Sequence, residues 1–521
     1  MTPFCYLVTG REMSRYDHNT IEYLKVPALI LMEQAALAVV EEVGRLFSPS
    51  EGRVLILAGG GNNGADALAV ARLLIQRNYE VTVFYLSDKP PEKLGELPGL
   101  QYEMLKKMGA RMVTELPLEE YAMVIDGVFG VGLSRPVSGE RARILEKVSG
   151  WKSLKLAIDV PSGLDSNTGK VLGTAFRADV TVTFGFLKLG LCLYPGVSHA
   201  GRIVVKEIGI TAASFLDEPP RWIALLGNPA RLLPKRPSEG HKGTFGKVLV
   251  VAGNEDIGGA PYLAALGALR TGCGMVRICT HRNQQSALTS LLPEALLDVY
   301  ADVQEALNRL DKGLAWADIV IFGPGTGTAS IAFGLLQKIL RENSLPLIID
   351  ADGINLLAAT DLGEELKALQ EKEENRRTLI LTPHLMELCR LTGESVERIR
   401  DRDCHVLEKA AQDYRGIVVQ KDARTLIMDH TGRGCVNLCG NSGMATAGSG
   451  DLLTGIIGAL LAQKMEGFKA ACLGVYLHGK AGDEAAAGGN EYSLTASDMG
   501  QALIALLRKN KEIVEEQDET L

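Results

Sequence analysis

The 521-residue sequence predicts an α/β protein with two domains. Two observations predict this class: short apolar runs rich in β-forming residues alternate with helical patterns, and the alternation occurs in two separate series. A polar, proline-bearing stretch at residues 216–243 contains no long periodic element and divides the two series. Because one ordinary core cannot hold the whole chain, we expect domains at residues 1–220 and 221–521.

Composition excludes several classes of protein. The sequence is 46% hydrophobic and 23% charged and has a net charge of -8, without a long basic run. Binding of nucleic acid needs clustered Lys and Arg, so nucleic acid is not an expected partner. Nine scattered cysteines without paired zinc-ligand spacing indicate free thiols in a reducing compartment. No basic leader and no apolar run of about 18 residues occurs, so we expect a cytoplasmic protein without a membrane partner.

Five apolar runs make up the first series. They are continuous rather than alternating, which is typical of parallel strands in a three-layer αβα sheet covered by helices on both faces. Such a sheet binds ligands at the carboxyl ends of its strands. The runs lie at residues 53–58, 80–86, 121–126, 154–160 and 179–184.

The first run leads directly into AGGGNNGADALAVAR at residues 58–72. A strand, a glycine turn and a helix in this order bring backbone amides close to a ligand. Asn62, Asn63 and Asp66 add side-chain oxygens, which could hold a cation or a polar ring as well as phosphate. The alternative is a generic glycine turn whose following helix is capped by Asp66. The helical spacing rests on the apolar residues Ala67, Leu68, Ala71 and Leu74.

Two further carboxylates of the first series end predicted strands. Asp126 ends YAMVID, and Asp159 lies in LAIDVPSGLD. Because parallel strands present their carboxyl ends at one edge of the sheet, both side chains should face the same crevice as Asp66. A single strand-terminal Asp usually caps the next turn, but three carboxylates beside glycine loops favour a ligand site.

The second series ends in two helical segments rich in Ala, Leu and Gly, at residues 451–463 and 468–488. The last dozen residues of the chain are typical of a frayed acidic helix end, to which we assign no function. The strand-like runs of this series lie at residues 246–254, 274–280, 317–325, 345–353, 377–384, 416–423 and 424–429.

The glycine-rich turn NSGMATAGSGDLLTG, residues 441–455, is the most informative feature of this half. It predicts a helix that begins near Ser449 and whose unpaired amides and dipole attract phosphate. Asp451 would lie beside a bound phosphoryl group, where a carboxylate can take the proton of a substrate hydroxyl. The alternative is a tight turn made by Gly448 and Gly450, with Asp451 as a helix cap.

Other loops of the second series should meet the same crevice. Glycine loops at residues 253–274 and 323–327 supply backbone amides next to strands. In TPHLME, a proline and a strand end aim His384 at the crevice, although a single His after a strand is more often a cap. KDART, residues 421–425, lies between two strands.

At this point the sequence resembles known families. GGGNNGAD, DGVFGVGLSRP and IDVPSGLDSNTG resemble the NAD(P)HX epimerase family, while residues 441–455 and KDART resemble the ADP-dependent NAD(P)HX dehydratase family. Both halves in one chain are similar to the bifunctional NAD(P)H-hydrate repair family, over roughly residues 5–215 and 235–510. The resemblance implies a Rossmann-like first domain and a ribokinase-like second domain.

The resemblance also implies two reactions. The first domain would epimerise (R)- and (S)-NAD(P)HX, and the second would dehydrate (S)-NAD(P)HX to NAD(P)H with ADP, giving AMP and phosphate. The expected partners are thus the small molecules NADHX and NADPHX, and family analogy adds self-association of the chain into a homo-oligomer.

For the first domain, the resemblance implies a potassium ion held by Asn63, Asp126 and Ser162. It places Asp159 at the nicotinamide-derived ring, as the acid–base residue at C6, the carbon that carries the hydroxyl. The chain departs from the family at Ala65 and Ala67, where glycine is common, and an added methyl would narrow the pocket or conflict with a positive φ. The implied contacts to the hydrated nucleotide are Asn62, Asn63, Gly64, Ala65, Asp66, Gly130, Val131, Gly132, Leu133, Ser134, Arg135, Pro136 and Asp159.

For the second domain, the resemblance implies ADP, or ATP in its place, as phosphoryl donor, together with Mg²⁺. Phosphoryl transfer to the C6 hydroxyl would turn a poor leaving group into phosphate, and Asp451 would take the hydroxyl proton. Gly448, Ser449 and Gly450 would present amides to the developing charge. The implied substrate contacts are Ala260, Gly325, His384 and Asp451, and the implied nucleotide contacts are Lys421, Asp422, Ala423, Arg424, Thr425 and Gly450.

Two alternatives stay open at this stage. The second domain could be a ribokinase-like small-molecule kinase, whose glycine turn and aspartate would look the same. The first domain could be a module that binds nucleotide without epimerising it. The NNGAD segment speaks against the kinase, because such kinases do not ordinarily carry it.

Overall fold

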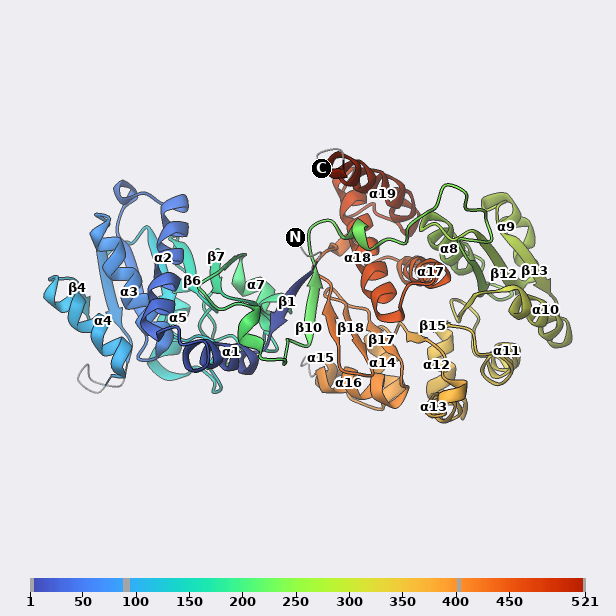
Figure 1. Ribbon diagram of the computed structural model, residues 1–521, viewed down its shortest axis with the longest axis horizontal. Coiled ribbons are helices and arrows are strands. Elements are labelled where there is room, and N and C mark those ends of the chain that lie inside the picture. The colour runs from blue at the N-terminus through green and yellow to red at the C-terminus, as the bar shows by residue number, and fades with distance from the viewer. Residues whose placement is uncertain (1–3, 88–93, 401–403, 519–521) are drawn as a thin grey trace. The chain divides into compact units, whose positions relative to one another are not determined.

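The computed structural model describes residues 4–87, 94–400 and 404–518. The chain divides into two compact units, Tyr6–Trp222 and, mainly, the residues from Ile223 onward (Figure 1). Strands alternate with helices along both units, which confirms the α/β class. Within the described ranges, no helix is both long enough and apolar enough to cross a membrane.

The first unit contains a seven-stranded sheet in the order β4-β3-β2-β5-β6-β7-β9, and all neighbouring strands pair in parallel. The order of the first six is that of a Rossmann-like sheet, with a switch point between β2 and β5. The strands are β2 (Val54–Ala58), β3 (Val81–Tyr85), β4 (Arg111–Val113), β5 (Met123–Gly127), β6 (Leu154–Ile158), β7 (Val180–Phe184) and β9 (Arg202–Lys206).

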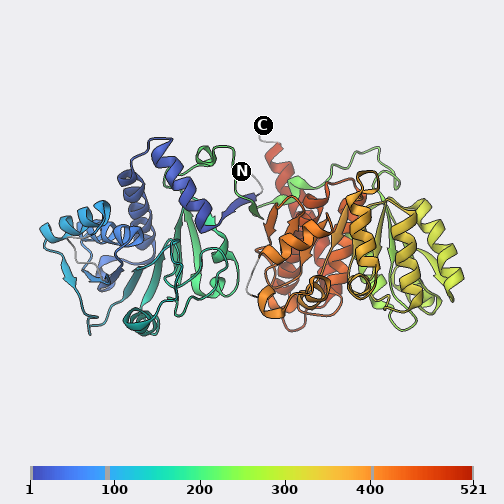
Figure 2. The same cartoon turned by 90° about the horizontal axis from the view of Figure 1, so that it is seen from below.

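Helices cover both faces of this sheet, because both sides of each central strand are apolar (Figure 2). In β2, Ile56 packs with residues of α2 and α3, whereas the adjacent Leu57 packs with residues of α5 on the other face. Two short strands lie outside this seven-stranded sheet, β1 (Phe4–Val8) and β8 (Leu187–Lys188), and they pair with each other in parallel through Leu7 and Leu187. The helices are α1 (Gly10–Glu22), α2 (Ala28–Leu46), α3 (Asn62–Gln76), α4 (Glu96–Lys107), α5 (Gly139–Ser149), α6 (Leu189–Cys192) and α7 (Gly196–Ala200).

The second unit is built on a sheet in the order β13-β12-β11-β14-β15-β16-β17-β18-β19, followed by β10. Its strands run parallel from β13 to β17, and β18 and β19 are antiparallel. The strands are β10 (Trp222–Leu225), β11 (Lys247–Val251), β12 (Met275–His281), β13 (Leu296–Tyr300), β14 (Ile319–Phe322), β15 (Leu347–Ile349), β16 (Leu379–Leu381), β17 (Ile417–Gln420), β18 (Leu426–Asp429) and β19 (Gly434–Val436).

Two groups of helices cover the faces of this second sheet. Buried residues of α8, α17, α18 and α19 form one core with Val248 and Val250 of β11, and α10 to α13 pack with Leu249 and Val251 on the other face. The helices are α8 (Gly259–Arg270), α9 (Gln285–Leu291), α10 (Val303–Trp316), α11 (Ser330–Glu342), α12 (Asp352–Ala359), α13 (Leu362–Glu371), α14 (Leu385–Thr392), α15 (Val396–Arg400), α16 (Cys404–Asp413), α17 (Ser449–Ala462), α18 (Gly467–Ala487) and α19 (Ala496–Asp518).

Helices α8 and α17 approach so closely that a glycine is required between them. A Cβ added at Gly455 would lie 1.9 Å from the carbonyl oxygen of Ala264. We therefore expect Gly455→Ala to lower the free energy of unfolding by about 1–3 kcal/mol, because backbone must move to admit the methyl. Gly334→Ala is the matched control, since a Cβ on this helical glycine meets nothing within 4 Å. Urea unfolding of both variants measures the difference; equal stabilities would contradict the tight contact.

Candidate active sites

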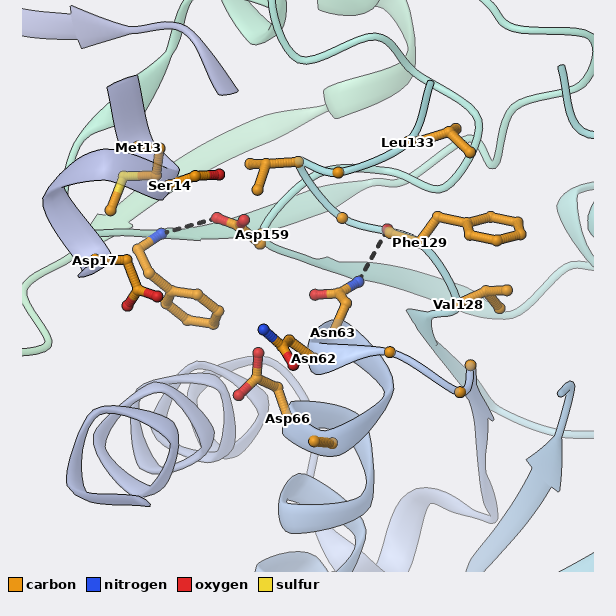
Figure 3. Close-up of a pocket in the computed structure, with 18 of the residues that line it drawn as sticks. Met13, Ser14, Asp17, Asn62, Asn63, Asp66, Val128, Phe129, Leu133 and Asp159 are labelled. Atoms are coloured by element: carbon orange, nitrogen blue, oxygen red, sulfur yellow. Dashed lines mark hydrogen bonds between the residues drawn. The ribbon is translucent and has the colours of Figure 1, made fainter. Parts of the chain in front are cut away.

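The first unit contains a cavity of about 1030 Å³ at the carboxyl edge of its sheet. Figure 3 shows Asn62, Asn63 and Asp66 entering it from the start of α3. Asp159 enters from the end of β6, and the loop Gly130–Pro136 lines the cavity from beside β5. The structure thus brings together nearly all of the predicted substrate contacts. Gly64 does not line the cavity, and a Cβ there would meet the Gly59 carbonyl oxygen at 1.9 Å.

The sequence analysis allowed for a positive φ at Ala65 and Ala67, and the structure does not have it. Both residues lie inside α3, and neither has a positive φ. Ala65 is buried and lines the cavity, while Ala67 is buried outside it, where it lies against Gly127. The prediction that alanine would conflict with a positive φ here is therefore wrong, because helix α3 already begins at Asn62 and both residues have helical backbone.

Asp66 and Asp451 are not helix caps. The cap positions of α3 and α17 are Gly61 and Gly448, and neither helix has a side-chain cap hydrogen bond. Gly448 has a φ of 85°, which glycine adopts without strain. The alternative explanation of these carboxylates as caps is therefore contradicted, and both remain available for a ligand.

The three predicted potassium ligands form a connected cluster behind the cavity. The Asp126 carboxylate is fully buried and accepts hydrogen bonds from the Ser162 hydroxyl at 2.6 Å and from the Ser162 amide at 2.7 Å. Asn63 donates its side-chain amide to the Phe129 carbonyl at 2.9 Å, as Figure 3 shows. Burial raises the pKa of Asp126 to about 6, although its hydrogen bonds lower it. Ser162 thus contacts the buried carboxylate directly, and Asn63 joins the cluster through the backbone of Phe129, whose amide donates to the Ser162 hydroxyl at 2.8 Å.

Asp159 is held in an unusual conformation beside a buried cation. Its φ of 63° is left-handed, which Asp tolerates better than most residues. The Lys188 ammonium, whose side chain is 1% exposed, lies 2.6 Å from the Asp159 carboxylate. Thr183 and the Phe184 amide also donate to the same carboxylate oxygen, at 3.0 and 3.3 Å. These contacts hold the Asp159 carboxylate in place at the edge of the cavity.

The second unit places Asp451 in the first turn of α17, next to a network of charged residues. Lys421 lies 2.6 Å from Asp350, whose second oxygen accepts from the Thr454 hydroxyl at 2.8 Å. Burial raises the pKa of Asp451 to about 6, and Asp350 adds to the rise while Lys421 opposes it. Burial lowers the pKa of Lys421, but Asp350 and the nearby acids raise it by more. The net pKa lies above the ordinary value of a lysine, so this ammonium stays charged.

The backbone at the end of β15 is strained where it supports this network. Ala351 has a φ of 48° and a ψ of -116°, a conformation that costs an alanine about 1–3 kcal/mol. It separates Asp350, which binds Lys421, from Asp352, which accepts the Gly327 amide at 2.9 Å. The strained backbone at Ala351 therefore directs the side chains of its two neighbours, Asp350 and Asp352, to different loops of the site.

The remaining predicted residues of this unit lie at strand ends and helix starts: Ala260 is in the first turn of α8, Gly325 follows β14, and His384 precedes α14. Gly325, with a φ of 65°, has no room for a Cβ, which would meet Ile257 at 2.6 Å and Ala260 at 3.1 Å. His384 caps α14 by accepting from the Met386 amide at 3.1 Å. The hairpin loop 421–425 connects β17 to β18. His384 thus has the capping role that sequence reasoning gave as its more frequent one, and a role in binding stays a prediction.

Three site residues were missed by the sequence analysis. Asp350 follows an apolar strand, so the rule that selected Asp126 and Asp159 would also have found it. Lys188 and Asp17 carried no such signal, because Lys188 is identified only by its contact with Asp159 and Asp17 only by its position in the cavity.

The fold and the two sites define a class: an α/β enzyme that combines a Rossmann-like unit with a second α/β unit built on a mixed sheet, each with its own acidic site. The chain belongs to the family of bifunctional NAD(P)H-hydrate repair enzymes. It is 35% identical to the Moorella thermoacetica enzyme over 98% of each chain and 36% identical to that of Thermofilum pendens over 96% of each. A family model for NAD(P)H-hydrate dehydratase matches residues 248–505, and one for the YjeF-related protein N-terminus matches residues 28–190.

Among solved structures, the chain is similar to the ADP/ATP-dependent NAD(P)H-hydrate dehydratase of Bacillus subtilis, co-crystallised with ATP and Mg²⁺. The identity is 28%, the TM-score is 0.46, and the match covers 54% of this chain and 96% of that one. Because the curated relatives match both halves together, the alternative of a small-molecule kinase fused to a binding module is not favoured.

Proposed function

We propose that this chain repairs hydrated nicotinamide nucleotides in two steps. The first unit interconverts the (R) and (S) epimers of NADHX and NADPHX, and the second removes water from the (S) epimer with ADP or ATP as phosphoryl donor. The observation that carries the proposal is the position of Asp451. Its carboxylate lies in the first turn of α17 beside the Lys421–Asp350 pair and does not cap the helix. We also propose that the protein acts in the cytoplasm and self-associates.

The dehydration step follows from the chemistry of the leaving group. Hydroxide leaves carbon poorly, whereas phosphate leaves readily. Asp451 takes the proton of the C6 hydroxyl as the oxygen attacks the terminal phosphoryl group of the nucleotide. The amides of Gly448 and Gly450 face the charge that develops on this group, while the Ser449 amide donates to the Thr446 carbonyl at 3.4 Å. Elimination of phosphate from the ring then yields the dihydronicotinamide.

The nucleotide contacts proposed for the second unit are those of the loop 421–425 and Gly450. The Lys421 ammonium faces inward to Asp350, so its charge supports the turn at Gly450, where a Cβ would lie 3.2 Å from the Lys421 Nζ atom. Within the described ranges, no group of three or more His, Cys, Asp or Glu side chains could hold a metal ion. We therefore propose that Mg²⁺ enters with the nucleotide and is held largely by phosphate and water, as this ion often is.

For the first unit, we propose that Asp159 exchanges a proton with the oxygen that leaves or adds at C6, and that a potassium ion binds Asn63, Asp126 and Ser162. The fit of the ion rests on the donor set, which consists of amide, carboxylate and hydroxyl oxygens. A cation there would also stabilise the charge of Asp126, which burial disfavours. The ion would supply electrostatic support for the loop that contacts the substrate.

The test is the regeneration of reduced coenzyme from a mixture of both epimers of NADHX. With purified full-length protein and ADP or ATP, we expect NADH absorbance to rise until both epimers are consumed, faster than spontaneous epimerisation allows. Without nucleotide, we expect no NADH. A protein that consumes only one epimer would lack the first activity, and one that produces no NADH with either nucleotide would refute the proposal.

A further inference from the structure

Helix α1 contributes an acidic side chain to the first cavity. Asp17 lines the same cavity as Asp66 and Asp159, and Figure 3 shows the three carboxyl groups coming from three different elements. Asp17 precedes residues 28–190, the range matched by the model for the first domain. Asp17 also lies outside the motifs by which the sequence resembles the epimerase family.

The position of Asp17 is fixed by the contacts of its helix. Thr9 and Glu12 form a capping box at the start of α1. The Gly10 amide donates to Asn167 at 2.7 Å, and the Asn19 side chain donates to the Ser214 carbonyl at 2.8 Å. The helix is therefore attached to the rest of the unit at both ends, and Asp17 is held at the cavity rather than carried by a loose terminus.

Asp17 lacks a partner of its own. Among the contacts of the described residues, its carboxyl group has no hydrogen bond and no ion pair. The Lys188 ammonium is engaged by Asp159 at 2.6 Å and by the Phe184 carbonyl at 2.7 Å. Burial raises the pKa of Asp17, and the charge of Asp159 raises it further, while His18 and Lys188 oppose the rise. Burial, Asp159 and Asp17 raise the pKa of Asp66 in the same way.

The site thus holds two kinds of acid. The Asp159 carboxylate has the Lys188 ammonium 2.6 Å away, whereas Asp17 has no such partner and burial raises its pKa. When two carboxyl groups in one site have environments that push their pKa values apart, one can act as the acid and the other as the base. Inversion at a carbon also requires departure from one face and addition to the other, so two proton-carrying groups are useful.

We propose that Asp17 is the second acid–base group of the epimerase site and contacts the hydrated ring together with Asp159. This inference rests on the proposed function. The C6–O bond breaks, the ring nitrogen lone pair forms the N1=C6 bond, and the departing hydroxide takes the Asp17 proton and leaves as water. Water then adds to the other face of C6 and gives a proton to Asp159, while the N1=C6 electrons return to nitrogen. Proton exchange with solvent restores both carboxyl groups, and no redox change occurs.

The test is Asp17→Asn in the full-length protein. We expect the epimerase kcat to fall about 100-fold or more, the usual contribution of a general acid, with a smaller change in KM. Dehydration of (S)-NADHX, a reaction of the second unit, should keep its rate, and an unchanged Tm of the first unit checks that the variant is folded. Glu22→Gln is the matched control, because it makes the same acid-to-amide change on an exposed position of the same helix, and should leave both rates unchanged.

A pH profile separates a chemical role from a structural one. If Asp17 acts in its protonated form, epimerase activity is lost as pH rises through its raised pKa, and this limb should be absent in Asp17→Asn. Asp17→Ala, which adds no polar group, should show the same loss. If the wild-type protein epimerises but Asp17→Asn keeps its rate and its alkaline limb, the inference is wrong. If the wild-type protein does not epimerise, the proposed function of the first unit fails instead.

Discussion

Asp451→Asn is expected to lower nucleotide-dependent dehydration of (S)-NADHX by about 100- to 10,000-fold, the range of a lost general base. The amide has nearly the shape of the carboxylate but cannot accept the hydroxyl proton. The epimerase rate of the same protein should be unchanged. NADH absorbance measures dehydration, and consumption of the (R) epimer measures epimerisation.

The pH dependence of the wild-type dehydratase should report the same carboxylate. Burial, with Asp350 as the next cause, raises the pKa of Asp451 to about 6. A base works only when it is ionised, so activity should increase as pH rises through about 6 and fall as pH drops below that value. A wild-type rate that is constant across this range would remove Asp451 from the proton-transfer step.

Stability provides the control for this variant. Because the pKa of Asp451 is higher in the folded state than its ordinary value of 3.8, the folded protein binds more protons, and stability falls as pH rises from about 4 to 6. The ionised carboxylate therefore costs stability at neutral pH. Asp451→Asn removes this cost, so we expect an equal or higher Tm. A variant that loses activity only because it unfolds would show the opposite change.

The sequence predicted the strands of both sheets where they are continuous and apolar. The runs at residues 53–58 and 246–254 became β2 and β11 because buried parallel strands must be apolar on both faces. Strands at the edges of the two sheets, such as β9 and β13, were missed. In β9 (Arg202–Lys206) every residue is exposed or half-buried, and in β13 (Leu296–Tyr300) only Asp298 and Tyr300 are buried, so neither forms a continuous apolar run.

The same distinction explains the sites. Asp126, Asp159 and Asp451 were predictable because a strand end or a helix start fixes where their side chains lie. The partnership of Asp159 with Lys188 depends on a loop that carries β8 to the cavity, and no local pattern encodes that approach. Asp17 enters through the packing of a whole helix. Local patterns thus locate the reacting groups, while the residues that tune their charge come from tertiary contacts.

Asp159→Asn is expected to reduce epimerisation to the spontaneous rate or close to it, a loss of about 100-fold or more for a general base. Asparagine is the matched substitution because, like aspartate, it tolerates the left-handed φ of 63° at this position. Dehydration of (S)-NADHX should continue at its normal rate. In the mixture of epimers, NADH should therefore form quickly from the (S) form and then slowly, at the rate of spontaneous epimerisation.

The buried ammonium of Lys188 makes a second variant necessary. Removal of the Asp159 charge leaves Lys188, which is 1% exposed, without its partner, and a buried unpaired charge typically costs about 3–5 kcal/mol. The single variant should therefore lower the Tm of the first unit. Asp159→Asn combined with Lys188→Met removes both charges and should recover most of this stability without recovering epimerase activity. Recovery of activity in the double variant would show that Asp159 supports the fold rather than the reaction, whereas stability without activity assigns the proton transfer to its carboxylate.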